Sequence, residues 1–99
     1  MHLTMHENAL QVQGLDYLSA TNAAAFKEAV RPRISQKHSI VEVDCSTVRF
    51  IDSEGLGALI SIHRSVLQHD GKVRLVHTSP LVHKLIQLIH FDEIFEIAP

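Results

Sequence analysis

The chain has 99 residues, of which 45% are hydrophobic and 20% are charged, and its formal net charge is −2. This length fits one domain, and the composition is that of an ordinary globular protein. The lysines and arginines are scattered and form no basic stripe, so we expect no binding to nucleic acid.

A single cysteine, Cys45, excludes an internal disulfide and suits a reducing compartment. The apolar runs are too short to span a bilayer, and residues 1–10 lack the basic and apolar blocks of a secretion signal. We therefore expect a cytoplasmic protein that does not insert into a membrane. The eight histidines have no metal-ligand spacing, and Cys45 has no evident base or cation beside it. The sequence therefore predicts no metal, no cofactor and no enzyme activity.

The first elements predicted along the chain are a hairpin and a helix. Apolar alternation in residues 2–6 and 9–14, with a tight turn between them, predicts two antiparallel strands. Ser19 is the expected cap of the following helix, and Pro32 should end that helix. Apolar residues recur at helical spacing between these two positions, namely Ala23, Phe26 and Val30.

A strand and a longer helix occupy the middle of the chain. Residues 39–46 are largely apolar and β-branched, which is typical of a buried central strand. A helix is predicted over residues 53–69, and Gly71 is expected to take the left-handed conformation after it. Its expected core-facing positions are Leu56, Leu59, Ile60, His63, Val66 and Leu67.

The last third of the chain predicts a strand, a helix and a short final strand. Residues 72–79 form the strand, and Ser79 followed by Pro80 is a typical start of a helix. Residues 93–99 are compatible with a short edge strand. The order β-β-α-β-α-β-α, with this optional strand, predicts an α/β fold with a mixed, mostly parallel sheet and helices packed on it.

The most unusual stretch is FIDSEGLGAL, residues 50–59, where a strand passes into a helix. A helix start exposes unpaired N–H groups, so Asp52 or Ser53 is expected to accept a hydrogen bond as the cap. Capping alone does not explain Gly55 and Gly57, because each glycine in a helix costs roughly 1 kcal/mol relative to alanine. We therefore expect a neighbouring strand or a partner to approach the backbone closely here.

The segment 41–86 resembles the central part of a STAS domain, the fold of anti-sigma factor antagonists and of the cytosolic tails of sulfate transporters. In that family a strand ends in an aspartate, here Asp44, and an apolar pair, here residues 50–51, precedes a signature that opens a helix. The signature is Asp-Ser-Ser/Thr-Gly-Leu, and residues 52–56 match it except at Glu54. Residues 14–20 match a further family segment. The resemblance extends over nearly all of residues 1–99 and implies a single STAS domain.

This resemblance implies a non-catalytic regulator that works by partner switching. In the antagonists, a hydroxyl of the signature is phosphorylated by a partner that is both anti-sigma factor and serine kinase. The unphosphorylated form binds that partner, and phosphorylation breaks the complex until a phosphatase resets it. The resemblance thus implies phosphorylation at Ser53. The partner-binding residues that it implies are Asp16, Asp52, Ser53, Glu54, Gly55, Leu56 and Gly57.

Glu54 stands where the family pattern has a second hydroxyl, which leaves two interpretations open. If the first position is the acceptor, Ser53 is the switch; if it is the second, Glu54 carries a permanent negative charge there. A permanent charge favours the alternative function, a constitutive accessory subunit of an ABC-type lipid transporter that contacts its ATPase. Two weaker alternatives are a nucleotide-binding module, for which no Gly-rich phosphate loop is visible, and a scaffold in a larger signalling assembly.

Overall fold

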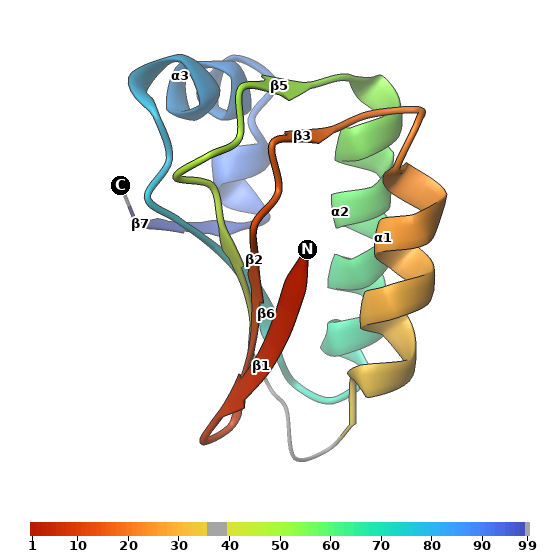
Figure 1. The fold of residues 1–99 in the computed structure, drawn as a ribbon. Coiled ribbons are helices and arrows are strands. Elements are labelled where there is room, and N and C mark those ends of the chain that lie inside the picture. The colour runs from red at the N-terminus through yellow and green to blue at the C-terminus, as the bar shows by residue number, and fades with distance from the viewer. Residues whose placement is uncertain (36–39, 99) are drawn as a thin grey trace.

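The computed structural model describes residues 1–35 and 40–98, and a five-stranded sheet forms its centre (Figure 1). In spatial order the strands are β1 (His2–His6), β2 (Ala9–Gln13), β4 (Ile40–Asp44), β6 (Lys72–Val76) and β7 (Glu96–Ala98). The first two are antiparallel, and all other neighbours are parallel. The predicted hairpin, the mixed α/β sheet and the short final strand are confirmed.

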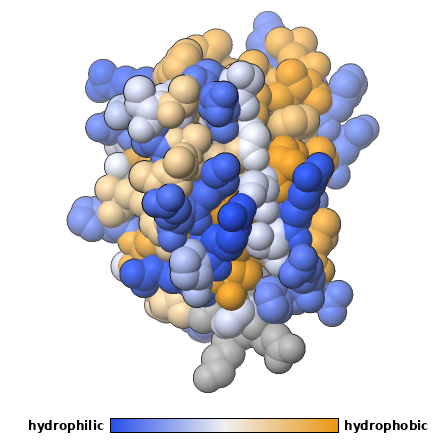
Figure 2. Space-filling view, turned by 90° about the vertical axis from the view of Figure 1, so that its right-hand side faces the viewer, coloured by the Kyte–Doolittle hydropathy of each residue, from blue (hydrophilic) through white to orange (hydrophobic). Residues whose placement is uncertain are grey.

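The helices divide between one face of the sheet and one end of it. The first helix, α1 (Ala23–Val30), and the second, α2 (Ser53–Leu67), lie side by side over the same face (Figure 1). The third, α3 (Pro80–Leu88), lies at the end of the molecule that also holds two short strands, β3 (Tyr17–Leu18) and β5 (Phe50–Ile51). Seen from the side of α1 and α2, hydrophilic residues are interspersed with apolar areas (Figure 2).

The core lies between the sheet and these helices. Leu10, Val41 and Val73 are fully buried opposite one another on β2, β4 and β6. Phe26 of α1 and Ile62 of α2 cover them from the helix side, and both are essentially inaccessible to solvent. Burial of one such side chain is worth roughly 1.5–3 kcal/mol relative to exposure, so alternation in the strands dictates which face the helices cover.

The buried face of α2 differs from the predicted one. Leu59 and Val66 are buried as expected, but Leu67 is exposed. The prediction followed the large apolar residues, whereas the observed stripe includes small residues at which a neighbouring segment comes close. The buried residues are Gly55, Ala58, Leu59, Ile62 and Val66, and the half-buried ones are Leu56, Ile60, Ser61, His63 and Ser65.

The predicted start of α1 is wrong. The Ser19 side chain does not cap the helix, which begins at Ala23 after the N-cap position Asn22. The Ser19 carbonyl instead accepts hydrogen bonds from the N–H groups of Asn22 and Ala23, at 3.1 and 2.8 Å. A turn therefore separates Ser19 from the helix. The predicted end is confirmed, because α1 stops at Val30 and a short 3₁₀ turn follows.

The turn after α2 also differs from the prediction. The left-handed residue is Asp70, with φ of 55°, and not Gly71. Aspartate tolerates this conformation better than most residues because its short polar side chain can hydrogen-bond locally. The Gly71 N–H donates to the Val66 carbonyl at 2.9 Å, which closes the end of the helix.

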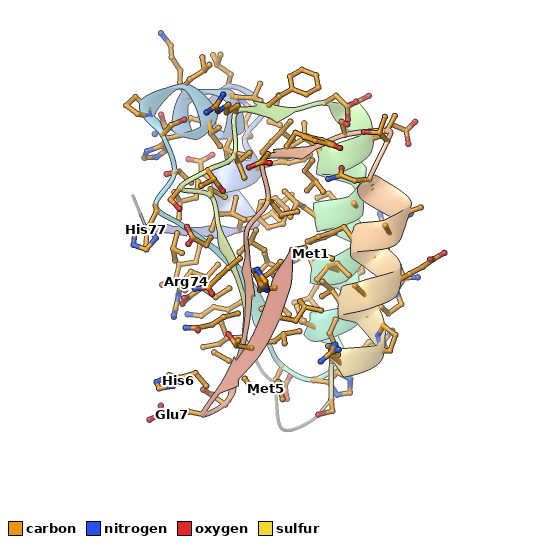
Figure 3. All side chains as sticks on the ribbon, viewed as in Figure 1. Met1, Met5, His6, Glu7, Arg74 and His77 are labelled. Carbon is orange, nitrogen blue, oxygen red and sulfur yellow. The ribbon has the colours of Figure 1, made fainter. Side chains whose placement is uncertain are left out.

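The sheet face opposite the helices is polar. One row of side chains crosses all five strands, formed by Thr4, Gln11, Glu42, Arg74 and Glu96. Within it the Arg74 guanidinium pairs with Glu42 and Glu96, each at 3.2 Å. Figure 3 shows Arg74 on the side of the sheet away from α1 and α2, together with His6 and His77. The polar side chains of this row interact with one another, so this face of the sheet can remain in contact with solvent.

Candidate functional site

The predicted signature lies at the junction between β5 and α2, next to a two-stranded ribbon. β3 and β5 pair in parallel, with Tyr17 opposite Phe50 and Leu18 opposite Ile51, and we call them the β3–β5 ribbon (Figure 1). The sequence did not predict β3, because two residues carry no periodic pattern. The ribbon brings the residues that precede α1 against those that precede α2.

Asp52 is the cap of α2. Its Oδ1 accepts a hydrogen bond from the Gly55 N–H at 2.9 Å, and its Oδ2 accepts one from the Ala20 N–H at 3.1 Å. One carboxylate thus starts the helix and ties down the segment that leads to α1. The bond from Gly55, together with that from Ala20, lowers the pKa of the Asp52 carboxyl below its usual value, because both stabilise the charged form.

Ser53 and Glu54 occupy the first two positions of α2, and both are exposed. Since Asp52 already serves the N–H group that a cap would satisfy, the Ser53 hydroxyl is not needed for capping. A negatively charged group on Ser53 would lie at the positive end of the helix dipole, which favours it by a few tenths of a kcal/mol or more. The carboxylates of Asp52 and Glu54 on either side oppose this effect.

The two glycines of the signature have different roles. A Cβ atom on Gly55 would overlap the backbone carbonyl of Leu18, so the contact between α2 and β3 requires glycine there. A Cβ on Gly57 would meet nothing within 4 Å, and this residue is exposed. Close approach of a neighbouring strand therefore accounts for Gly55 and leaves Gly57 without an explanation inside the fold. Leu56, between them, is half-buried.

Two exposed aromatic side chains lie beside this helix start. Tyr17 and Phe50 face each other across the β3–β5 ribbon and are 43% and 56% exposed. Their neighbours Leu18 and Ile51 point the other way, into the core. In the sequence pattern Phe50 is one half of an apolar pair with Ile51. Strand alternation from Ile51 could have indicated that Phe50 faces solvent.

Asp16 lies at the other end of the ribbon from Asp52. Its carbonyl accepts the Arg49 N–H at 2.8 Å, just before the two short strands begin, whereas Asp52 follows them. Asp16, Arg49 and Ser79 line a surface pocket of about 430 Å³ that opens between three loops, those following β2, β4 and β6. The structure thus places Asp16 at this pocket, and groups Asp52, Ser53, Glu54, Leu56 and Gly57 at the start of α2.

The groups considered for metal or nucleophile chemistry lie elsewhere. Cys45 is buried, and this burial, with the nearby Asp44 carboxylate, raises the pKa of its thiol to about 12. Within residues 1–35 and 40–98, no three His, Cys, Asp or Glu side chains are placed to hold a metal ion. The helices in the described part of the chain are also too short or too polar to cross a membrane.

The family model described as the STAS domain matches residues 3–99. The chain belongs to the STAS domain family. The family assignment made from the sequence is therefore confirmed.

Solved structures share this STAS fold over nearly the full chain. A candidate anti-sigma factor antagonist from Thermotoga maritima has a TM-score of 0.85 at 23% identity, covering 99% of this chain and 85% of that one. The anti-sigma factor antagonist SpoIIAA in its unphosphorylated form has a TM-score of 0.78 at 20% identity, with coverage of 99% and 87%. The Bacillus cell fate determinant SpoIIAA in its phosphorylated form has 0.70 at 19%, with 99% and 90%.

Proposed function

We propose that this STAS domain is a non-catalytic anti-sigma factor antagonist that works by partner switching. Its partner would be a protein that is both anti-sigma factor and serine kinase, and a phosphatase would reset the system. The switch is phosphorylation of Ser53. The observation that carries this proposal is that Asp52 caps α2, so the exposed Ser53 hydroxyl remains available for modification.

The docking surface in this proposal has an apolar part and a charged part. Phe50 and Tyr17 are the apolar anchors, since exposed aromatic residues commonly carry much of the energy of a protein interface. Gly57 lets a partner approach the backbone of α2 closely, and Asp52 and Glu54 supply negative charge. Asp16 lies at the rim of the surface, beside the pocket.

Phosphorylation would change the charge of this surface more than its shape. A phosphoryl group adds about −1.5 to −2 charges at neutral pH. The start of α2 tolerates them through its dipole, but a partner surface that fits one hydroxyl and two carboxylates would lose affinity by repulsion and desolvation. The likeness to SpoIIAA, which is known in an unphosphorylated and a phosphorylated form, supports this switch.

Phosphopeptide mass spectrometry of protein from its native cells tests the switch. The tryptic peptide from Phe50 to Arg64 contains Ser53 and Ser61, and fragmentation distinguishes the two. We expect phosphate on Ser53 in a fraction of the protein that changes with growth or stress. Complete absence of phosphate at Ser53 under all conditions would overturn the switch.

Measurements of binding to the proposed anti-sigma kinase from the same cells test the docking surface. Ser53→Asp should weaken binding while Ser53→Ala binds as the wild type does, and equal affinities would contradict the proposal. Gln68→Glu, with the same added charge at the far end of α2, is the matched control.

Phe50→Ala should weaken binding about tenfold, and Leu88→Ala, which truncates an exposed apolar side chain of α3, should not.

A second candidate function is favoured by the exposed carboxylate of Glu54. It gives the start of α2 a fixed charge next to Ser53. With such a charge the domain could be a constitutive accessory subunit of an ABC-type lipid transporter, bound to its ATPase. Co-purification with an ATPase, and no phosphate on Ser53, would favour this function over the switch.

A further inference from the structure

The two edges of the sheet differ in how well they are protected against pairing with another strand. The β7 edge is three residues long, and Glu96 on it pairs with Lys72 at 2.6 Å and with Arg74 at 3.2 Å. Short, charged edges of this kind resist pairing with other strands. The β1 edge is five residues long, and its sequence HLTMH contains no proline, lysine, arginine or acid. Its register with β2 is continuous from His2 to His6, without a bulge.

The outer side of β1 offers an unused set of backbone groups. β1 is the last strand in the sheet order, and none of the strands in the described residues pairs with its outer side (Figure 1). A regular edge strand is a template on which another strand can add by hydrogen bonds. Met5, which lies opposite the buried Leu10, is 50% exposed at this edge, so an added strand would also bury apolar surface.

The sequence of β1 is symmetric in chemical type about Thr4. Reading outward in both directions gives one apolar residue, Leu3 or Met5, and then one histidine, His2 or His6. Figure 3 shows His6 and Met5 on opposite sides of β1, as strand alternation requires. An isologous interface needs a surface patch that is complementary to itself, and a strand with this symmetry fits that condition.

We propose that β1 pairs antiparallel with β1 of a second copy of this chain, with Thr4 on the two-fold axis. Leu3 then lies opposite the partner's Met5 on the core side of the sheet. His2 lies opposite the partner's His6 on the open side, and the two Thr4 residues face each other. The pairing continues one sheet through both protomers.

The proposed dimer is small and does not involve the start of α2. One five-residue strand edge buries little area, which places the interface at the low end of specific protein contacts, below about 1,200 Å². We therefore expect a weak dimer that forms as the protein concentration rises. None of the residues assigned to partner binding belongs to β1, so each copy keeps its own surface around Ser53. The proposal is independent of the proposed function.

Complementary charges at Thr4 test the dimer and its register together. Wild-type protein, followed by sedimentation velocity from micromolar to millimolar concentration, should rise in mass toward twice that of the chain. Thr4→Lys and Thr4→Glu each place two like charges opposite each other at the two-fold axis of the dimer. Each variant should therefore associate about fivefold more weakly. An equal mixture of the two variants should recover the wild-type association or exceed it.

The controls separate the proposed contact from general effects of charge. Thr4 is exposed, so both variants should keep the wild-type circular dichroism and melting temperature. Gln68→Lys adds the same charge at the end of α2 and should dimerise like the wild type. A monomer at every concentration overturns the proposal. So does equal behaviour of Thr4→Lys and Gln68→Lys, or a mixture of Thr4→Lys and Thr4→Glu that stays monomeric.

Discussion

The first turns of α2 and α3 both expose backbone N–H groups that need a capping side chain, and a different type of residue caps each helix. Each helix follows a strand and has a serine close to its first turn. At α3, the Ser79 hydroxyl accepts the Val82 N–H at 3.1 Å and is the cap. At α2, the Asp52 carboxylate is the cap, and Ser53 lies exposed one position later. A serine at a helix start is free for chemistry only where another side chain has taken over the capping.

Two neighbouring segments also hold the start of α2. The α2 start is fixed on β3 through Gly55 and on the segment before α1 through Asp52 and Ala20. These contacts fix the position of the backbone at the start of α2, where Ser53 is exposed. Substitutions at both helix starts test this difference.

The contact between α2 and β3 should be the most sensitive point. Gly55→Ala puts a methyl group onto the Leu18 carbonyl, which cannot move without disturbing the β3–β5 ribbon. We expect a loss of about 3 kcal/mol in the free energy of unfolding. Urea denaturation measures it. A Gly55→Ala variant of wild-type stability would mean that α2 is not packed on β3 as described.

The Asp52 cap should be worth more than the Ser79 cap, because its carboxylate accepts two backbone N–H groups from different segments. Asp52→Ala should therefore lower the melting temperature more than Ser79→Ala does. The difference should also depend on pH. The folded pKa of Asp52 is lowered from the usual 3.8, so its contribution is complete above that pH and is lost as the pH falls below it.

Thermal melts of Asp52→Ala and the wild type between neutral pH and the acid limit of folding check this dependence. The two stabilities should converge at low pH. Ser79→Ala is the control, because its hydroxyl does not titrate and its cost should stay constant. A gap between Asp52→Ala and wild type that does not shrink in acid would show that the carboxylate charge is not what stabilises α2.

The two serines should differ in how much their truncation to alanine lowers the free energy of unfolding. Ser79→Ala removes a cap and should cost about 1 kcal/mol. Ser53→Ala removes a hydroxyl that caps nothing and should change the free energy of unfolding by less than about 0.5 kcal/mol. Chemical denaturation of both variants under one condition makes the comparison, and a larger loss at Ser53 would contradict the assignment of the caps.

Replacement of Gly57 by alanine should raise the stability slightly and weaken the binding of a partner. Gly57→Ala places a methyl group in open space and replaces the poorer helix former, so we expect a gain of up to about 1 kcal/mol. If a partner approaches α2 here, the same variant should bind the anti-sigma kinase more weakly. A variant that is more stable and binds normally would remove Gly57 from the proposed surface.

Elements with strong local signals were predictable from the sequence. The hairpin of β1 and β2 follows from alternation on both sides of a short turn, and the start of α3 from the pair Ser79 and Pro80. The signature at residues 52–56 was recognisable because its residue types occur at fixed spacing. Each of these signals lies within a few residues of the feature that it predicts.

Features that depend on distant segments were not predictable. Tyr17 lies opposite Phe50, and Gly55 lies against Leu18, over separations of more than thirty residues in the chain. The sequence alone left both glycines, and both Asp52 and Ser53, as equal candidates for one role. The packing of α2 on β3 distinguishes the glycines, and the hydrogen bonds that Asp52 accepts from Gly55 and Ala20 distinguish the cap.

The sequence by itself determined the α/β class, the order of the elements and the membership of the STAS family, because these follow from periodicity and from one local motif. The tertiary structure decided which of Asp52 and Ser53 caps α2, which glycine is obligatory and which aromatic residues face solvent. These depend on the pairing of β3 with β5, and such a pairing depends on the fold as a whole, because two residues contain too little local information to specify it.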